Sequence, residues 1–382
     1  MALREAGEDS ELLTYPFGDE RLDSPIEPVR PRILSFTRSL RSGPSAAKLI
    51  LDLQLVFSLR RMPGVEPLIA HHVEAAWAAR LAGRPYHYVA HTSVEDELEA
   101  YFPRIRFEAA RRGLRLIGAF IDRVAIRGAR RCAAVSPALG HRLRERHERA
   151  FHYLPIPWSL PRLEDPKAAR RALGLNEDAV VMLYTGNLDA YQRWEIGFEI
   201  AEALRAGGRE VVYLIGTESD PAQVHEYVAR RRFEGVYRVL GCAHEEERAI
   251  LHAAADFALI PRRLDGGVPI KLLEALAHDL PALVSEEASA GLPLEGEVRI
   301  VSSGRLADYL KAAEDLMERT SVTPAGDRSH GGREFIARAH SNRAAVEAFR
   351  QMTMPRQKAD ETGGHEVGWR FERIERREPE PL

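Results

Sequence analysis

The strongest constraint on the fold is an alternation of short β-rich runs and helix-length segments between about residue 178 and residue 318. The runs are almost continuously apolar, and the segments between them carry apolar residues at spacings of three and four. Strands that are apolar on both faces and separated by helices predict a doubly wound α/β domain with a parallel sheet. We expect strands at Val180–Tyr184, Val211–Ile215, Tyr237–Leu240, Phe257–Ile260, Ala282–Val284 and Val298–Val301.

The same alternation predicts helices at 194–206, 221–232, 244–254, 270–278 and 305–317. A second α/β unit lies upstream, with a strand at Pro67–Ala70, a helix at Glu74–Leu81 and a strand at Tyr86–Ala90. Four prolines between residues 155 and 166 separate the two units, and repeated proline favours an extended connection over a helix. We therefore place the hinge there.

The predicted division has an N-terminal domain over 1–158 and a C-terminal domain over 159–332. A C-terminal helix is expected over 333–354, and a disordered tail over 355–382, where Pro, Glu, Arg and Gly prevail without a periodic apolar face.

The beginning of the chain is unusual for a doubly wound domain. Ala2–Ala6 is typical of the last turn of a helix, Gly7 of its C-terminal stop, and Glu11–Tyr15 of a following strand. Because such a domain normally opens with a strand, we expect the first strand and most of the first helix to be missing. A misassigned start site and a shortened chain both explain this.

Charge and cysteine content exclude several functional classes. The chain has 54 Lys and Arg against 57 Asp and Glu, a net charge of −3, so we expect no nucleic-acid partner. Its 2 cysteines form no Cys/His cluster, which argues against a disulfide framework or structural zinc. The charged N-terminus is unlike a secretory signal, and no apolar run of about 18 residues occurs. A cytoplasmic location is the simplest expectation.

Glycines follow three of the predicted strands, at Gly186, Gly216 and Gly241. Ligands bind beyond the carboxyl ends of parallel strands, where glycine lets backbone N–H groups come close. Simple turn glycines would give the same pattern. A Gly-x-Gly-x-x-Gly fingerprint is absent from the sequence, which argues against a nicotinamide dehydrogenase.

The segment after the Ile260 strand is the most informative. A Gly266-Gly267 loop leads to Pro269, a residue typical of the first helical turn, and a helix N-terminus is a ready anion site. Lys271 would add a positive charge toward a diphosphate. Glu274, one turn further on the face of Ile270 and Lys271, would accept hydrogen bonds from ribose hydroxyls. The alternative is a solvated Lys-Glu pair.

The residues Gly267-Val-Pro-Ile-Lys-Leu-Leu-Glu-Ala-Leu-Ala resemble the donor-site motif of family 4 glycosyltransferases of the GT-B fold. The resemblance implies two Rossmann-like domains facing a cleft, and a nucleotide diphosphate sugar as donor. Backbone N–H groups around Gly267 and Ile270 would hold the diphosphate, Glu274 the ribose, and no metal or cofactor would be needed. Many members carry a further Glu eight positions earlier, where this sequence has Gly266.

The stretch from Leu183 to Trp194 is similar to the element that opens the C-terminal domain in this family. Family members commonly have an Arg and a Lys for phosphate neutralisation, where this chain has Asn187 and Gln192. Neither side chain supplies charge. The cationic contribution must therefore come from Lys271, Arg193 or Arg262, or be weaker than in other members. We include Gly186 and Gly216 with these residues in the predicted donor site.

Histidines follow two N-terminal strands, in Ile69-Ala-His-His-Val-Glu and Val89-Ala-His-Thr-Ser. The resemblance implies that His91 contacts the donor sugar or its phosphate, as the catalytic-site histidine, and that His71, His72 and Glu74 face the acceptor. A structural role is the alternative for each histidine.

The sequence therefore predicts a retaining glycosyltransferase that uses an unidentified hydroxyl acceptor. The alternatives are a nucleotide-sugar-binding protein with weak or no turnover, and a GT-B sugar-nucleotide epimerase. The arginine-rich stretch 104–131 contains interspersed apolar residues. It predicts either a core helix with a solvated outer face, which we favour, or a basic surface for peripheral contact with the inner face of the membrane, where the acceptor would be lipid-linked.

Overall fold

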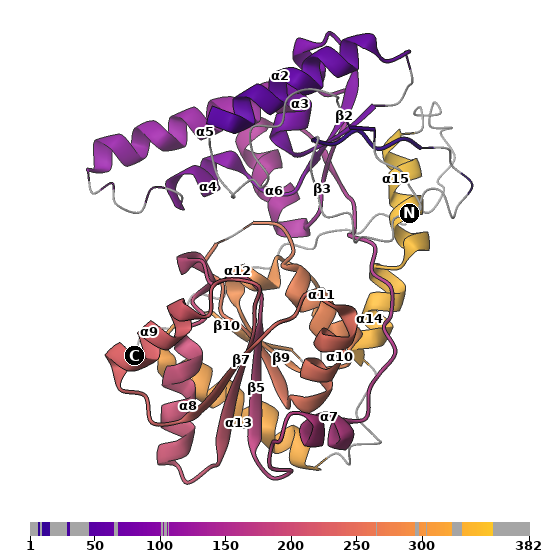
Figure 1. The fold of residues 1–382 in the computed structure, drawn as a ribbon. Helices are drawn as coiled ribbons and strands as arrows, with labels where there is room; N and C mark the ends of the chain where they lie inside the picture. The colour runs from indigo at the N-terminus through magenta and orange to yellow at the C-terminus, as the bar shows by residue number, and fades with distance from the viewer. Residues whose placement is uncertain are drawn as a thin grey trace, which may run out of the picture.

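The computed structural model describes residues 7, 10–15, 29–30, 46–64, 68–100, 102, 105, 107–264, 266–294, 298–302, 304–322 and 331–353 of the 382-residue chain. Two α/β domains lie one above the other, each built around a parallel sheet (Figure 1). Their sheets span residues 68–153 and 180–301 and so fall on either side of the predicted hinge. The predicted boundary at 158/159 remains an expectation, as do the bounds of the other segments.

The N-terminal sheet has four strands in the order β1-β2-β3-β4, all parallel. Tyr86 and Tyr88 of β2 are fully buried, and the Tyr86 hydroxyl donates to the Ala125 carbonyl at 2.7 Å. The described elements are β1 (Leu68–His71), β2 (Tyr86–Ala90), β3 (Cys132–Ala134), β4 (Phe151–Tyr153), α2 (Ala46–Arg61), α3 (His72–Leu81), α4 (Val94–Ala100), α5 (Glu108–Gly128) and α6 (Pro137–His147).

The C-terminal sheet has six strands in the order β10-β9-β8-β5-β6-β7, all parallel. Its described elements are β5 (Val180–Thr185), β6 (Val211–Gly216), β7 (Val236–Leu240), β8 (Phe257–Ile260), β9 (Ala282–Ser285), β10 (Val298–Val301), α7 (Pro166–Ala172), the 3₁₀ turn η1 (Ala190–Gln192), α8 (Ile196–Ala206), α9 (Ala222–Arg231), α10 (Glu245–Ala254), α11 (Ile270–Ala277), α12 (Glu286–Ser289) and α13 (Leu306–Val322).

The strand order places a topological switch point in the C-terminal sheet. The chain runs outward from β5 through β6 to β7 and then crosses back to β8, which pairs with β5 on its other edge. The loops after β5 and β8 therefore leave the same edge of the sheet side by side. In open α/β sheets this is where ligands bind.

Both faces of this sheet are covered, as the apolar strands predict. Helices α8, α9 and α13 pack on one face, around the buried Phe198 and Tyr213. Helices α7, α10, α11 and α14 cover the other, with Leu272 and Leu276 fully buried. All six strand predictions here are confirmed within one residue at each end, because two-sided burial leaves an unmistakable apolar run.

The C-terminal helical segment is two helices rather than the one that was expected over 333–354. Helix α14 (Gly331–Ala339) and helix α15 (Asn342–Thr353) are separated at His340 and Ser341. The Ser341 hydroxyl accepts from the Ala344 amide at 3.2 Å and so caps the second helix. Helix α15 crosses to the N-terminal domain, where Met352 packs with Val89 and Val135 (Figure 1).

The unusual start of the chain is largely outside the described residues. Ala2–Ala6 and the tail from residue 354 belong to this part. Within Glu11–Tyr15 the predicted strand is reduced to an isolated parallel bridge between Leu13 and Val29. The expectation of a missing first strand and helix therefore stays a prediction.

Candidate functional site at the domain junction

Lys271 is the half-buried centre of the predicted donor site. It lies in the first turn of α11, and its ammonium donates to the Gln192 side-chain oxygen at 2.8 Å and to the Tyr184 hydroxyl at 3.2 Å. It also lies 4.2 Å from the centroid of the Tyr184 ring. Lys271 thus connects the helix after the β8 loop with β5 and with the loop that follows β5, at the switch point of the sheet.

The pKa of Lys271 is lowered from its ordinary value of 10.5 to about 7, mainly by burial and to a smaller extent by the positive charge of the nearby Arg262 guanidinium. An ammonium in this position is poorly solvated and is therefore ready to bind an anion. Both neighbours of Lys271 are neutral hydrogen-bonding groups rather than carboxylates. Its charge is consequently available to a ligand.

Glycines allow the surrounding backbone to come this close. Gly186 has φ of +123°, and a Cβ placed there would lie 2.9 Å from the Lys271 ammonium. A Cβ at Gly267 would lie 2.2 Å from the His91 carbonyl oxygen of the other domain. Gly186 is therefore required by its backbone conformation, and Gly267 by the contact between the domains.

Arg262 is a second buried cation at the junction. Its side chain is 9% exposed, donates to the Gly267 carbonyl at 3.3 Å and lies 6.0 Å from the centroid of the Tyr191 ring. A Cβ at Gly266 would lie 2.6 Å from its guanidinium. Arg262 therefore occupies the space next to position 266 that a longer side chain would need, which accounts for glycine there.

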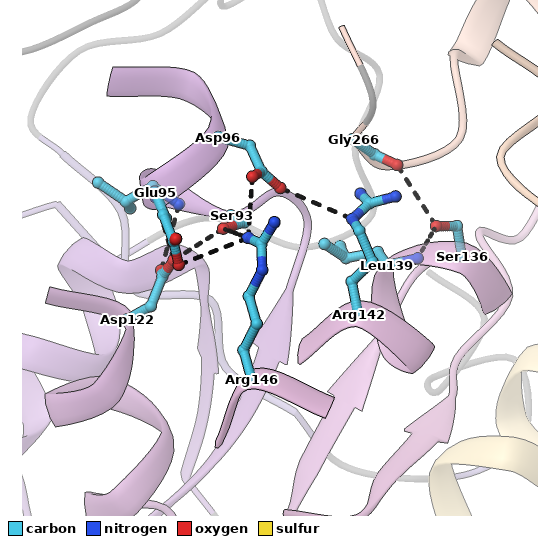
Figure 2. Close-up of polar contacts among 10 residues, drawn as sticks. Ser93, Glu95, Asp96, Asp122, Ser136, Leu139, Arg142, Arg146 and Gly266 are labelled. Carbon is cyan, nitrogen blue, oxygen red and sulfur yellow. Dashed lines mark hydrogen bonds and ion pairs between the residues drawn. The ribbon is translucent and has the colours of Figure 1, made fainter. Parts of the chain in front are cut away.

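Glu97 brings a carboxyl to the same place from the N-terminal domain. Burial raises the pKa of this carboxyl, while a hydrogen bond from Thr92 and the positive charge of Arg262 act in the opposite direction. The junction is also closed by the Ser136 hydroxyl, which donates to the Gly266 carbonyl at 3.4 Å (Figure 2).

Glu274 lies one turn beyond Lys271 and forms an ion pair with Arg248 of α10 at 2.7 Å. Arg248 also donates to the carbonyls of Cys242 and Ala243, so it ties the end of the loop after β7 to α11. Glu274 is thus held close to the loop that follows β7. The simple Lys271–Glu274 pair offered as an alternative is not formed, because each side chain has a different partner.

The other predicted donor residues are less central. Asn187 donates to the Asp189 carboxylate at 2.8 Å, and the Arg193 guanidinium donates to the Gly304 carbonyl at 3.3 Å. Ile270 is 56% exposed. Gly216 ends β6, and its carbonyl accepts from the Gly186 amide at 2.9 Å. Of the three cations considered from the sequence, Lys271 and Arg262 converge and Arg193 does not.

Three histidines gather on the N-terminal side of the junction. The ring nitrogens His71 Nδ1 and His91 Nε2 are 2.9 Å apart, and the His72 ring stacks on His91 with centroids 4.3 Å apart. His72 has φ of +67°, a strained value for this residue, at the sharp turn from β1 into α3. The sequence placed these residues on separate strand ends, and the structure brings them together.

Desolvation, followed by the charges that His72 and His71 could carry, lowers the pKa of His91 to about 3. Desolvation likewise lowers the pKa of His71 to about 4. The imidazoles are therefore neutral at physiological pH. They act as hydrogen-bond donors and acceptors rather than as charged groups. Glu74 is close to this cluster and pairs with Lys48 of α2 at 2.7 Å.

A buried carboxylate holds the helix that carries Glu97. Asp122 of α5 is 1% exposed and accepts from the Ser93 hydroxyl at 2.9 Å and from the amides of Val94 and Glu95 at 3.2 Å each (Figure 2). Burial raises the pKa of Asp122 to about 6. Arg146 of α6 fixes the outer side of α4 through Asp96 at 2.8 Å.

Tyr184, Arg248 and Glu97 belong to the site, but the sequence analysis did not single them out. Tyr184 lies inside an apolar strand, where it looks like an ordinary core residue. Arg248 is one of many arginines in the sequence. Glu97 lies in an acidic run typical of a solvated helix. Only the tertiary structure separates these residues from their neighbours.

The chain is similar to known glycosyltransferases in both sequence and structure. Residues 179–319 match the family model described as "Glycosyl transferases group 1". The matched segment contains all the strands of the C-terminal sheet, from β5 to β10. The D-inositol 3-phosphate glycosyltransferase of Geodermatophilus obscurus is 30% identical over 182 residues, which are 44% of this chain. The aligned region spans only 40% of that relative's length.

Solved glycosyltransferase structures share the two-domain arrangement. Sucrose-phosphate synthase from Thermosynechococcus elongatus has a TM-score of 0.69 at 18% identity, over 92% of this chain and 89% of that chain. WaaG, a glycosyltransferase involved in lipopolysaccharide biosynthesis, has a TM-score of 0.68 at 12% identity, over 93% and 94%. Anabaena HepE in complex with UDP and glucose has a TM-score of 0.62 at 14% identity, over 86% and 85%. The overall fold is therefore GT-B.

Proposed function

We propose that the protein transfers a sugar, with retention of anomeric configuration, from a nucleotide diphosphate sugar to a hydroxyl acceptor. The observation that carries the proposal is Lys271 at the start of α11, buried against Gln192 and Tyr184 where the loops after β5 and β8 meet the other domain. The group 1 domain and the UDP complexes of HepE support a nucleotide-sugar donor.

In the proposed reaction the bond between the anomeric carbon and the diphosphate oxygen breaks, and the acceptor oxygen bonds to that carbon on the same face. The acceptor proton passes to the departing phosphate oxygen, so the step balances without a protein nucleophile. Negative charge grows on the diphosphate, where Lys271, Arg262 and the N-terminus of α11 stabilise it. We propose that neither a metal ion nor another cofactor takes part.

The N-terminal histidines suit the remaining task, the orientation of hydroxyl groups. Neutral imidazoles both donate and accept hydrogen bonds. We assign His91, which is in contact with His71 and His72, to the donor sugar, and we assign His71, His72 and Glu74 to the acceptor. Holding both substrates in one geometry supplies the entropic part of the rate enhancement.

A panel of UDP-, GDP-, ADP- and TDP-sugars, each incubated with the protein and hydroxyl acceptors, tests the proposal. We expect release of nucleoside diphosphate from one donor class, with loss of release in K271M. Nucleotide binding without release in any combination would favour the binding-protein alternative, which Asn187, Gln192 and Gly266 motivate. Conversion of the sugar nucleotide without an acceptor would favour an epimerase.

We further propose that the acceptor is presented at an anionic lipid surface, which contacts α2 and α5. Leu116, Ile117 and Phe120 of α5 are 66%, 54% and 59% exposed. Arg112, Arg123 and Arg127 are exposed on the same helix, and helical spacing of three, four and seven residues places them beside Leu116 and Phe120. A face that mixes arginines with large apolar side chains is typical of interfacial helices.

Helix α2 extends this apolar surface. Leu49, Leu53 and Phe57, at spacings of four, are 67%, 54% and 51% exposed. Both α2 and α5 pack against α3 in the part of the N-terminal domain remote from the C-terminal domain (Figure 1). None of the described helices has an apolar stretch long enough to cross a membrane. The favoured expectation of a solvated outer face on α5 is therefore incomplete, because that face is partly apolar.

Vesicle sedimentation distinguishes the two interpretations of α5. We expect binding to vesicles that contain an anionic phospholipid and little binding to neutral vesicles. The L116S/F120S variant should bind less to either kind of vesicle. Equal sedimentation of this variant and the unmodified protein would exclude α5 as the contact.

A further inference from the structure

Two histidines and a glutamate converge between α10 and α11, behind the predicted donor site. His252 comes from α10, whereas Glu274 and His278 come from α11, where they are one turn apart. One potential ligand atom from each side chain lies within 4.8 Å of the other two. The two imidazoles stack with centroids 4.5 Å apart and planes inclined by 13°.

The hydrogen bonds of these residues prepare them for a cation. His252 is 3% exposed, and its Nδ1 lies 2.7 Å from the Arg248 carbonyl oxygen. Because a carbonyl only accepts, Nδ1 carries the proton, and Nε2 has the lone pair that a metal ion binds. Histidine ligands in metal sites are oriented by this kind of backbone hydrogen bond.

Glu274 is oriented in a similar way. Its Oε1 atom accepts from Arg248 at 2.7 Å, and the side chain is 13% exposed. The ion pair with Arg248 fixes the carboxylate and leaves Oε2 for a second cation. Arg248 thus holds two of the three side chains, His252 through its backbone carbonyl and Glu274 through its guanidinium.

We propose that His252, Glu274 and His278 bind a divalent transition-metal ion of the zinc class. Two imidazoles and one carboxylate are the donor set that Zn²⁺ favours over Mg²⁺ or Ca²⁺, which prefer oxygen ligands. Three protein ligands leave a fourth position for water. Because imidazole lone pairs lie in the ring planes, and these planes are inclined by only 13°, the two rings must turn toward each other to share one ion. This site takes no part in the proposed transfer step.

Through this site a metal ion regulates nucleotide binding. This extension of the proposal rests on the proposed function. Glu274 is the residue assigned to the donor ribose, and a carboxylate bound to a metal ion is less available to ribose hydroxyls. Occupancy of the site therefore antagonises nucleotide binding. By linkage, nucleotide must weaken metal binding by the same factor.

The first experiment measures metal binding alone, without nucleotide, so that it does not depend on the proposed function. Zn²⁺ is titrated calorimetrically into the full-length protein, and Co²⁺ is used for the visible absorption of a tetrahedral nitrogen and oxygen site. To exclude the other histidine cluster, all proteins carry H71N/H72N/H91N. We expect one equivalent to bind, with affinity reduced at least about tenfold by H278N.

His141 and Glu145 of α6 provide the matched control. They also form a His/Glu pair one helical turn apart, with 3.5 Å between His141 Nδ1 and Glu145 Oε1, on the surface. H141N should leave metal affinity unchanged. H278N changes a partly exposed side chain, and thermal unfolding checks that it folds. Equal affinities of H278N and H141N, or an absence of metal binding by the parent protein, would overturn the proposal.

A second titration measures UDP and GDP binding with and without Zn²⁺, in a parent protein and an H278N variant that both keep His71, His72 and His91. We expect Zn²⁺ to weaken binding in the parent protein but not in H278N. Metal binding without this coupling would refute the regulatory extension while leaving the metal site intact. Nucleotide binding that is absent under all conditions would instead contradict the proposed function.

Discussion

The two sides of the domain junction carry different chemistry. The C-terminal side has two cations next to a helix N-terminus, the half-buried Lys271 and the buried Arg262. The N-terminal side has three neutral imidazoles and the buried carboxyl of Glu97. A charged leaving group fits the first surface, and uncharged hydroxyl groups fit the second. In the proposed reaction, this difference would keep the charged donor and the uncharged acceptor on separate sides of the junction.

The largest predicted effect comes from removing a cation. We expect R262A to lower kcat/KM by about a hundredfold or more, because a buried donor at the developing charge is lost. R262K should recover part of the activity, since it keeps the charge but not the planar geometry. Initial rates of nucleoside diphosphate release measure both. R193A serves as the comparison, because Arg193 is turned toward Gly304, and it should stay within about threefold. An equal loss in R193A would refute the assignment to Arg262.

The second prediction concerns the pH dependence of nucleotide binding. Lys271 has a pKa of about 7 without ligand, and a diphosphate binds its protonated form. Affinity should therefore fall as pH rises above 7, by up to about tenfold per pH unit. Calorimetry of UDP or GDP binding between pH 6 and 9 measures this slope. K271M should bind weakly with a flat profile, and a parallel decline in this variant would place the titrating group elsewhere.

The histidine side should respond differently. H91A should lower kcat by about tenfold, the value of one lost hydrogen bond in the transition state. Because the pKa of His91 is about 3 and that of His71 about 4, these imidazoles stay neutral from pH 5 upward. The pH–rate profile of the unmodified enzyme should then show no acid limb from this cluster between pH 5 and 7. A limb near pH 6 that H91A removes would contradict the neutral assignment.

The smallest effect on activity is expected when the hydrogen bonds that hold α4 in place are weakened. D122N keeps one acceptor where the carboxylate accepts three hydrogen bonds, and we expect it to lower the free energy of unfolding by about 1–3 kcal/mol. Activity of the folded variant should change only a few-fold. Urea denaturation and rate measurements test both statements, and an unchanged midpoint would show that Asp122 is not needed to hold the helix.

The raised pKa of Asp122 adds a pH signature to that stability test. Its folded pKa of about 6 lies above the ordinary 3.8, so the folded state holds the proton more tightly. The resulting stabilisation is complete below pH 4 and is lost as pH rises through 6. This pH-dependent part of the free energy of unfolding should be absent from D122N.

The sequence predicted the C-terminal sheet well because its strands are buried on both faces. It also singled out Gly267, Lys271 and Glu274, because they lie in one short motif. It did not indicate which side chains from distant parts of the chain would contact each other. Arg248 and Glu97 look like ordinary surface charges in the sequence, and their roles depend on α10 meeting α11 and on one domain meeting the other. The break at His340 was also missed, because an apolar periodicity continues through it.

That break has a mechanical consequence. The amide of Trp158 donates to the His340 carbonyl at 2.7 Å, and His340 Nδ1 donates to the Ile156 carbonyl at 2.9 Å. The two passages of the chain between the domains are thereby joined to each other at one place. Any swing of one lobe relative to the other must turn about this joint, and both backbones share the bending.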